Sequence, residues 1–330
     1  MPPVSVIVCA HDEEKNIREL VPILLQQKYP EFEVIIVEDR CNDETYDFLL
    51  DAVKRDTRLK MVRVTHLPAH ISGKKFALTL GIKAAVNDWV LLTDADCRPG
   101  PNWIASMAAH CKEEKKIVIG YSPYQREPGY LNNFIRFESL VTGIQYMGWA
   151  LLGNPYMGVG RNLAYRKALF IDNKGFNKHL GVIGGDDDLF VNEHATEENV
   201  AVCIGADSLT PSIPKRTWSE FFRQKIRHLA VGKKYRLSDK LVLGFFSLSW
   251  VLSWIFVVPL LFTQTGLNLY LWAGFVLREI MLAIVIGIAS RALGDRLAAW
   301  KTPVLDFNYA IYYLGTGLVA LVSKRVRWKK

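Results

Sequence analysis

Two groups of carboxylates stand close enough together in the sequence to do chemistry. The stretch WVLLTDADC places Asp94 and Asp96 one residue apart at the end of an apolar run. The stretch GGDDDLF places Asp186, Asp187 and Asp188 directly after two glycines. Neighbouring carboxylates repel one another unless a cation compensates their charge. The first group therefore indicates a ligand site or an ordinary turn, and the second a catalytic site or an acidic helix start.

The elements that must position these carboxylates follow from the hydropathy pattern. Short β-branched apolar runs alternate with stretches of helical periodicity, which predicts an α/β fold with a mostly parallel sheet and helices on both faces. In such a sheet ligands bind at the carboxyl ends of the strands, where Asp94 and Asp96 stand. The expected strands are Val4–Cys9, Glu33–Val37, Leu59–Val64, Trp89–Thr93 and Ile117–Gly120, and the expected helices lie near 15–27, 43–55, 74–86 and 102–112.

The turn after the first expected strand bears on the class of ligand. It reads AHDEEKN and contains no glycine. Dinucleotide-binding proteins place a glycine-rich fingerprint at this turn, where the backbone approaches the pyrophosphate. The sequence therefore disfavours a nicotinamide-dependent dehydrogenase.

Charge is distributed unevenly along the chain. Residues 1–214 carry 23 Lys and Arg against 28 Asp and Glu, a net of −5, whereas residues 215–330 carry 18 against 5, a net of +13. The basic residues of the second part flank long apolar runs, which is the arrangement expected at an anionic membrane surface. We therefore expect a membrane, and no nucleic acid, as a partner.

Two apolar runs in the second part are long enough to cross a bilayer, residues 241–263 and 267–289. The second contains Arg278 and Glu279, a pair of charges expected to face protein or a polar cavity. A weaker third run covers residues 304–322, and whether it crosses is left open. Basic residues before the first run place its start on the cytoplasmic side. These features predict a multi-pass protein of the cytoplasmic (inner) membrane with its N-terminal domain in the cytoplasm.

An amphipathic stretch over residues 130–152 is rich in Phe, Tyr, Trp and Met. Its aromatic side chains indicate either packing into a core or a helix at a membrane interface or facing an acceptor. The pattern alone does not decide between these interpretations.

Taken in order, the motifs resemble those of the family 2 inverting glycosyltransferases, which have the GT-A nucleotide-sugar-binding fold. SVIVCAHDEEKNI resembles the family's opening strand and loop, VIIVEDRCNDET its second strand and acidic turn, GKKFALTLGIKAA its lysine-bearing helix and LLTDADC its DxD motif. GGDDDLF is similar to its catalytic ED block and RQKIRH to its QxxRW block. The resemblance implies a GT-A domain over 1–214, a basic amphipathic juxtamembrane segment over 215–240 and a membrane domain over 241–330.

The resemblance also implies a donor site. A nucleotide-diphosphate sugar carries concentrated negative charge, which Mg²⁺ or Mn²⁺ held by oxygen ligands can neutralise. Asp96 is then the expected metal ligand, and Asp94 either helps to hold the metal or contacts the ribose. The nucleotide-binding residues that the resemblance implies are Ala10, His11, Asp39, Lys74 and Asp94.

On the acceptor side, an inverting transfer needs one base that takes the proton of the acceptor hydroxyl. Aligning Asp188 with the family's final Asp of the ED block makes Asp186 the base. Gly185 stands where the family usually has Glu, so Asp187 remains the alternative base.

The residues similar to the QxxRW block are Gln224, Arg227 and His228, which the resemblance places at the diphosphate and the acceptor. Arg227 could stabilise the leaving diphosphate there. His228 replaces the Trp that lines the acceptor channel of processive synthases, so we expect transfer of one sugar to a lipid-linked or other membrane-proximal acceptor. The alternatives are a processive polysaccharide synthase and an inactive membrane-bound nucleotide-sugar-binding protein. The sugar, the nucleotide, the acceptor and the oligomeric state do not follow from the sequence.

Overall fold

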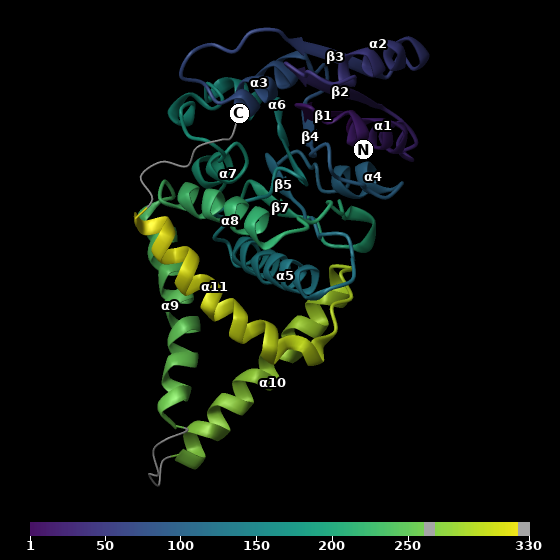
Figure 1. Ribbon diagram of the computed structural model, residues 1–330. Coiled ribbons are helices and arrows are strands. Elements are labelled where there is room, and N and C mark those ends of the chain that lie inside the picture. Colours follow the sequence, from purple (N-terminus) through teal and green to yellow (C-terminus); the bar gives the residue numbers. More distant parts are fainter. Residues whose placement is uncertain (261–267, 323–330) are drawn as a thin grey trace. The chain divides into compact units, whose positions relative to one another are not determined.

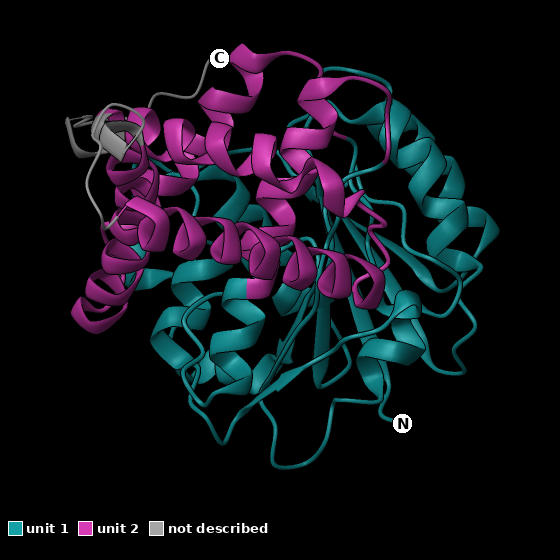
Figure 2. Cartoon of the chain, turned by 90° about the horizontal axis from the view of Figure 1, so that it is seen from below, with its two compact units in different colours: residues 1–125, 145–213 teal, residues 126–144, 214–330 magenta. Residues whose placement is uncertain are grey.

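The chain divides into two compact units, which Figure 2 distinguishes by colour. The computed structural model describes residues 1–260 and 268–322, so residues 261–263 of the first expected apolar run lie outside the described residues. Unit 1 contains residues 1–125 and 145–213, and unit 2 contains residues 126–144 and 214–330. The second unit thus begins where the sequence becomes basic, but it also includes the segment 126–144 from the middle of the acidic part.

Unit 1 is built on a seven-stranded sheet with the order β3-β2-β1-β4-β6-β5-β7 (Figure 1). β6 runs antiparallel to β4 and β5, and the other neighbours are parallel. The predicted mostly parallel sheet is therefore confirmed, with one antiparallel strand inserted. The strands are β1 (Val4–Ala10), β2 (Phe32–Asp39), β3 (Leu59–Val64), β4 (Trp89–Leu92), β5 (Ile117–Ile119), β6 (Leu163–Arg166) and β7 (Val200–Val202).

Helices cover both faces of this sheet, so nearly all residues of its central strands β1 and β4 are buried. On one face, Val6 and Val34 belong to a buried cluster with side chains of α1 (Glu14–Leu25) and α4 (Trp103–Ala108). On the other face, α3 (Gly73–Ala84) lies so close that a Cβ at Gly81 would approach Ile7 and Val37 to 2.8 Å. Unit 1 also contains the helices α2 (Thr45–Arg55), α6 (Lys167–Asp172) and α7 (Asp188–His194).

Unit 2 is helical in its described part. It contains α8 (Trp218–Gly232), α9 (Leu237–Leu260), α10 (Asn268–Ala292), α11 (Thr302–Val322) and the first part of α5 (Tyr130–Leu151). α8 begins at a cap in which the Thr217 side chain accepts the N–H of Glu220. α11 packs against α8, α9 and α10.

The aromatic side chains at the start of α5 are packed into unit 2. The ring of Phe134 lies 5.5 Å from that of Trp218, and the ring of Phe137 lies 5.7 Å from that of Tyr309. Both phenylalanines are buried. For these residues the structure confirms the core-packing interpretation of the stretch 130–152.

Two helices of unit 2 are long and apolar enough to cross a membrane, Leu237–Val257 and Asn268–Ala292. Their apolar side chains are largely exposed in the described chain, for example Phe245 at 75% and Ile288 at 64%. The charges predicted to face protein do so, because Arg278 forms an ion pair of 2.7 Å with the fully buried Asp306 of α11 and a second one with Glu279.

Candidate active site

The carboxyl ends of three neighbouring strands carry several of the predicted site residues. β1 ends at Ala10, β2 ends at Asp39, and β4 leads into Asp94. β1 lies between β2 and β4 and is parallel to both, so the three ends meet at one edge of the sheet (Figure 1). The strand order changes direction here, and this is the place where open α/β sheets bind ligands.

Lys74, in the first turn of α3, joins two of the predicted carboxylates. Its Nζ lies 2.9 Å from Asp94 Oδ1 and 3.1 Å from Asp186 Oδ2. Burial by itself would lower the pKa of Lys74, but the charges of Asp186, Asp94 and Asp187 outweigh it and hold the pKa well above the ordinary value. Lys74 is therefore a permanent cation between residues that the sequence assigned to donor and acceptor.

Asp187 and Asp186 differ in what surrounds their oxygens. Asp187 Oδ2 accepts the N–H of Gly160 at 2.6 Å, and its Oδ1 accepts the N–H of Asp188 at 2.8 Å, where it caps α7. Burial and the neighbouring charge of Asp186 raise the pKa of Asp187, against the opposing charge of Lys74. Asp186 instead faces the Lys74 ammonium. Asp187 thus has a structural task at the helix start, and the role of Asp186 as the base stays a prediction.

A cavity of about 10 Å³ lies among these side chains. Lys74, Asp94, Gly160 and Asp186 line it together with Cys9, Leu78, Leu92 and Thr93. This volume is on the order of that required by one water molecule. A sugar or a phosphate therefore does not fit into this cavity as it stands.

Asp39 is already paired. Arg40 donates to both of its carboxylate oxygens, at 2.7 and 3.1 Å. His11 contacts the backbone oxygen of Asp39 through Nδ1 at 2.5 Å, and Ala10 is fully buried. The three residues lie together at the sheet edge, while their contacts to a nucleotide stay predictions. The base of a nucleotide that hydrogen-bonds to Asp39 would have to share the carboxylate with Arg40 or displace Arg40.

Asp94 and Asp96 lie on the turn that follows β4. The N–H of Cys97 donates to the backbone oxygen of Asp94, and that of Ile213 to the backbone oxygen of Asp96, each at 3.1 Å. Two half-buried carboxylates on a fixed turn offer the hard oxygen donors that Mg²⁺ and Mn²⁺ accept, so the residues fit a divalent cation. At Asp94, the Lys74 ammonium provides positive charge in this structure.

Another group of possible metal ligands consists of Asp12, Cys41 and Asp43, whose ligand atoms lie within 4.8 Å of one another. Backbone N–H groups already occupy these atoms. Asp12 Oδ1 accepts from Asn42 at 2.6 Å, Cys41 Sγ from Asp12 at 3.4 Å and Asp43 Oδ2 from Glu14 at 3.0 Å. The group ties the turns after β1 and β2 together, and we interpret it as structural.

Lys75 is a contributor that the sequence reasoning missed. It is fully buried, and its Nζ donates to the backbone oxygens of His179 at 2.6 Å and Val182 at 3.0 Å. Both oxygens belong to the segment that leads to Asp186, His179 at the end of a short 3₁₀ helix and Val182 in the loop that follows. The twin lysines of GKKFALTL were the available signal, but a lysine beside a site lysine is usually solvated. Lys75 therefore holds the loop while Lys74 holds its carboxylate.

Gln224, Arg227 and His228 lie on α8 of unit 2. The spacing of three residues between Gln224 and Arg227 places both on one side of the helix. Their roles toward the diphosphate and the acceptor stay predictions.

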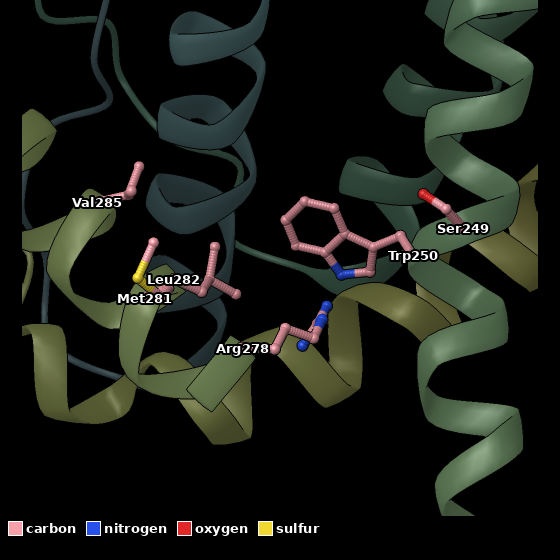
Figure 3. A pocket seen from close by; sticks show the side chains of 6 residues that line it. All are labelled: Ser249, Trp250, Arg278, Met281, Leu282 and Val285. Atoms are coloured by element: carbon pink, nitrogen blue, oxygen red, sulfur yellow. The ribbon is translucent and has the colours of Figure 1, made fainter. Parts of the chain in front are cut away.

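A second cavity, of about 250 Å³, lies between α9 and α10 in unit 2. Ser249, Trp250, Arg278, Met281, Leu282 and Val285 line it (Figure 3). Trp250 and Arg278 point toward one another across it, and the guanidinium lies 5.5 Å from the Trp250 ring. Asp306 and Glu279 already pair with Arg278, so these three side chains have no net positive charge for an anionic ligand.

Comparisons with known proteins agree with the fold and with the family that the sequence resembles. The family model described as "Glycosyl transferase family 2" matches residues 5–172, and "Glycosyl transferase family group 2" matches residues 89–314. The chain is 25% identical over 245 residues to the "Probable glycosyltransferase YdaM" of Bacillus subtilis, covering 71% of this chain and 56% of that protein. It is 27% identical over 156 residues to an "Uncharacterized glycosyltransferase" of Haemophilus influenzae, covering 47% and 45%. The chain thus spans about half the length of these relatives.

Two solved structures share the fold. The mannosyltransferase PcManGT from Pyrobaculum calidifontis, in complex with GDP-Man and Mn²⁺, has a TM-score of 0.62 at 18% identity and is matched over 98% of this chain and 88% of that one. S. aureus TarS 1-349 in complex with UDP has a TM-score of 0.51 at 17% identity, over 99% and 94%. The GT-A fold expected from the sequence is confirmed.

The loop before Asp186 should loosen when Lys75 is replaced. We expect Lys75→Met to raise the amide hydrogen-exchange rate of residues 177–187 by about tenfold or more, because two buried hydrogen bonds to this loop are lost. Mass spectrometry of peptides from the intact protein measures this rate. Lys83→Met, at an exposed position of the same helix, is the matched control and should leave the loop unchanged. Equal exchange in Lys75→Met and the wild type would contradict the assignment.

Proposed function

The chain belongs to glycosyl transferase family 2, and we propose from this membership that it transfers a sugar from a nucleotide-diphosphate donor to a membrane-proximal acceptor, with inversion. The observation that carries the proposal is the Lys74 ammonium, which lies 2.9 Å from Asp94 and 3.1 Å from Asp186. One cation thereby joins the turn expected at the donor diphosphate to the carboxylate expected at the acceptor.

In the proposed reaction Asp186 is the base. It takes the proton of the acceptor hydroxyl while that oxygen attacks the sugar carbon on the face opposite the leaving diphosphate. The new carbon–oxygen bond forms as the bond to the diphosphate breaks, which inverts the configuration. Asp187 is the less suitable base, because its two oxygens accept the N–H groups of Gly160 and Asp188.

On the donor side, Asp96 and Asp94 would hold Mg²⁺ or Mn²⁺. When bound, the cation neutralises charge on the diphosphate. The protein's own contribution is the fixed turn that presents both carboxylates, with the neighbouring Lys74 that can approach a phosphate once it leaves Asp94. The structures of PcManGT with GDP-Man and Mn²⁺ and of TarS with UDP support a nucleotide-sugar donor. They do not identify the base of the nucleotide.

The acceptor is proposed to be lipid-linked because of α9 and α10. These helices present apolar side chains on their exposed surfaces and have the length of membrane spans. Basic residues of the segment 215–240 lie before α9 and in its first turn, and suit the cytoplasmic face of a membrane. We therefore propose a cytoplasmic-membrane protein whose unit 1 lies in the cytoplasm. Asp306 of α11 forms an ion pair with Arg278 of α10 inside unit 2. We therefore propose that α11 does not cross the membrane as a separate span.

A divalent cation should strengthen nucleotide binding. We expect UDP or GDP to bind at least about tenfold more tightly with Mn²⁺ than in chelator, and Asp96→Asn to abolish this difference, because one charged oxygen ligand is lost. Isothermal calorimetry measures both affinities. Asp12→Asn, in the structural carboxylate group, is the control and should retain the difference. Equal affinity of the wild type in chelator would refute the metal role.

Replacement of the base should separate turnover from binding. Asp186→Asn should lower transfer or donor hydrolysis by about a hundredfold or more, the scale of general-base catalysis. Its donor affinity should stay within about twofold, since the base acts on the acceptor. The assay is release of nucleoside diphosphate from a panel of nucleotide sugars. If Asp187→Asn is the inactive variant and Asp186→Asn is active, the base is Asp187. Polymeric products would favour a processive polysaccharide synthase. If the wild type turns over none of the donors, an inactive nucleotide-sugar-binding protein would be favoured.

The two apolar helices should form a hairpin that returns to the cytoplasmic side. A membrane-impermeant thiol reagent applied to intact cells should label Asn268→Cys, at the start of α10, and spare Ala292→Cys, at its end. The reason is that basic residues flank the outer ends of the pair, before α9 and after α10. Permeabilised cells, in which both positions should react, are the control. The reverse labelling pattern would overturn the topology.

A further inference from the structure

Arg161 lies at the edge of the candidate site and has no part in the mechanism derived above. Its neighbours in the chain are held firmly: the N–H of Gly160 donates to Asp187, and the side chain of Asn162 donates to the backbone oxygens of Tyr121 and Ser208. The backbone oxygen of Arg161 itself accepts from the Thr210 hydroxyl at 2.9 Å. The position of this arginine is therefore fixed by contacts with separate segments.

The guanidinium of Arg161 is also oriented. It lies over the ring of Tyr124, with 4.5 Å between Cζ and the ring centroid. Its Nη1 is buried and has no hydrogen-bond partner among residues 1–260 and 268–322. A buried cationic donor without an acceptor is costly, so the Nη1 group calls for one, such as a water, an ion or a ligand.

The surroundings of Arg161 indicate what the missing acceptor is. An arginine keeps its charge in a protein, and of the acidic groups around Arg161 the ionised carboxylates of Asp96 and Asp94 attract it. Tyr124, whose ring lies under the guanidinium, and Cys97, which follows Asp96, each form a β-bridge with Ser212, so Arg161 lies near the turn that carries the carboxylate pair. Oxygen anions with several acceptors, such as phosphates, match the planar fork of an arginine better than neutral hydroxyls do.

We propose that Arg161 binds a phosphate oxygen of the nucleotide-diphosphate donor, next to the Asp94–Asp96 turn. This inference rests on the proposed function, because a sugar-nucleotide enzyme supplies the diphosphate. A phosphate could also arrive on a phosphorylated lipid acceptor. The neighbouring carboxylate pair selects the donor, since a divalent cation held there would draw the diphosphate to it.

The test compares ligand binding with stability. In the presence of Mn²⁺, Arg161→Met should weaken binding of UDP or GDP, whichever the wild type binds, by at least about tenfold, the factor given by one charge-assisted hydrogen bond. Arg161→Lys should lose less, because it keeps the charge but not the fork. The Tm of ligand-free Arg161→Met should be unchanged or higher, since a buried charge without a partner is replaced by an apolar chain.

Arg63→Met is the matched control. Arg63 also lies over a tyrosine, with its Cζ 3.8 Å from the ring centroid of Tyr46, but it already pairs with Glu38 at 3.1 Å. Its replacement should leave nucleotide affinity unchanged. A purely structural role of Arg161 would lower the Tm and spare affinity, which would overturn the inference.

Two further outcomes are decisive. If Arg161→Met weakens binding of an alkyl phosphate in detergent and spares the nucleoside diphosphate, the arginine serves the acceptor and the inference is wrong. If the wild type binds no member of a panel of nucleoside diphosphates with Mn²⁺, the proposed function fails first, and the inference fails with it.

Discussion

The site depends on one positive charge placed among several negative ones. Asp94, Asp186 and Asp187 approach one another in a partly buried space, and such a cluster is unfavourable unless a cation compensates it. Lys74 does so through two short ion pairs. Its own position is set by α3, which Gly81 allows to lie directly on β1 and β2. Close packing of a helix on a sheet thus decides where the charge of the site stands.

The rest of the site is held by hydrogen bonds to backbone groups. Lys75 fixes the loop before Asp186, Asp187 fixes the start of α7 against Gly160, and the turn of Asp94 is tied to the segment around Ile213. Strand ends supply one wall and loops supply the other. This division is physically sensible, because the strands give rigidity, while loops carry polar groups that a sheet interior could not accommodate.

Unit 2 contains two buried aspartates that form ion pairs with arginines of other helices or segments. Arg136 meets Asp295 and Arg278 meets Asp306, with both aspartates buried. Buried ion pairs add little stability, but breaking one leaves an uncompensated charge, so they favour one arrangement of helices over others. The Arg136–Asp295 pair is one of the contacts that join the first part of α5 to the C-terminal part of unit 2. Many apolar side chains of α9 and α10 remain exposed.

The sequence by itself determined the α/β sheet, the approximate strands and helices, the apolar C-terminal helices and the carboxylates at the strand ends. Periodicity and motif spacing are local, and parallel strands must present their carboxyl ends at one edge. Only the tertiary structure decided that Lys74 joins Asp94 to Asp186 and that Asp187 caps a helix. The same holds for the pairing of Arg40 with Asp39 and for the position of Arg161 near the turn of Asp94 and Asp96. The contact of Lys75 with His179 shows the reason, because it joins positions 104 residues apart. Such contacts depend on how loops close over the sheet, and no local pattern of residue types encodes that closure.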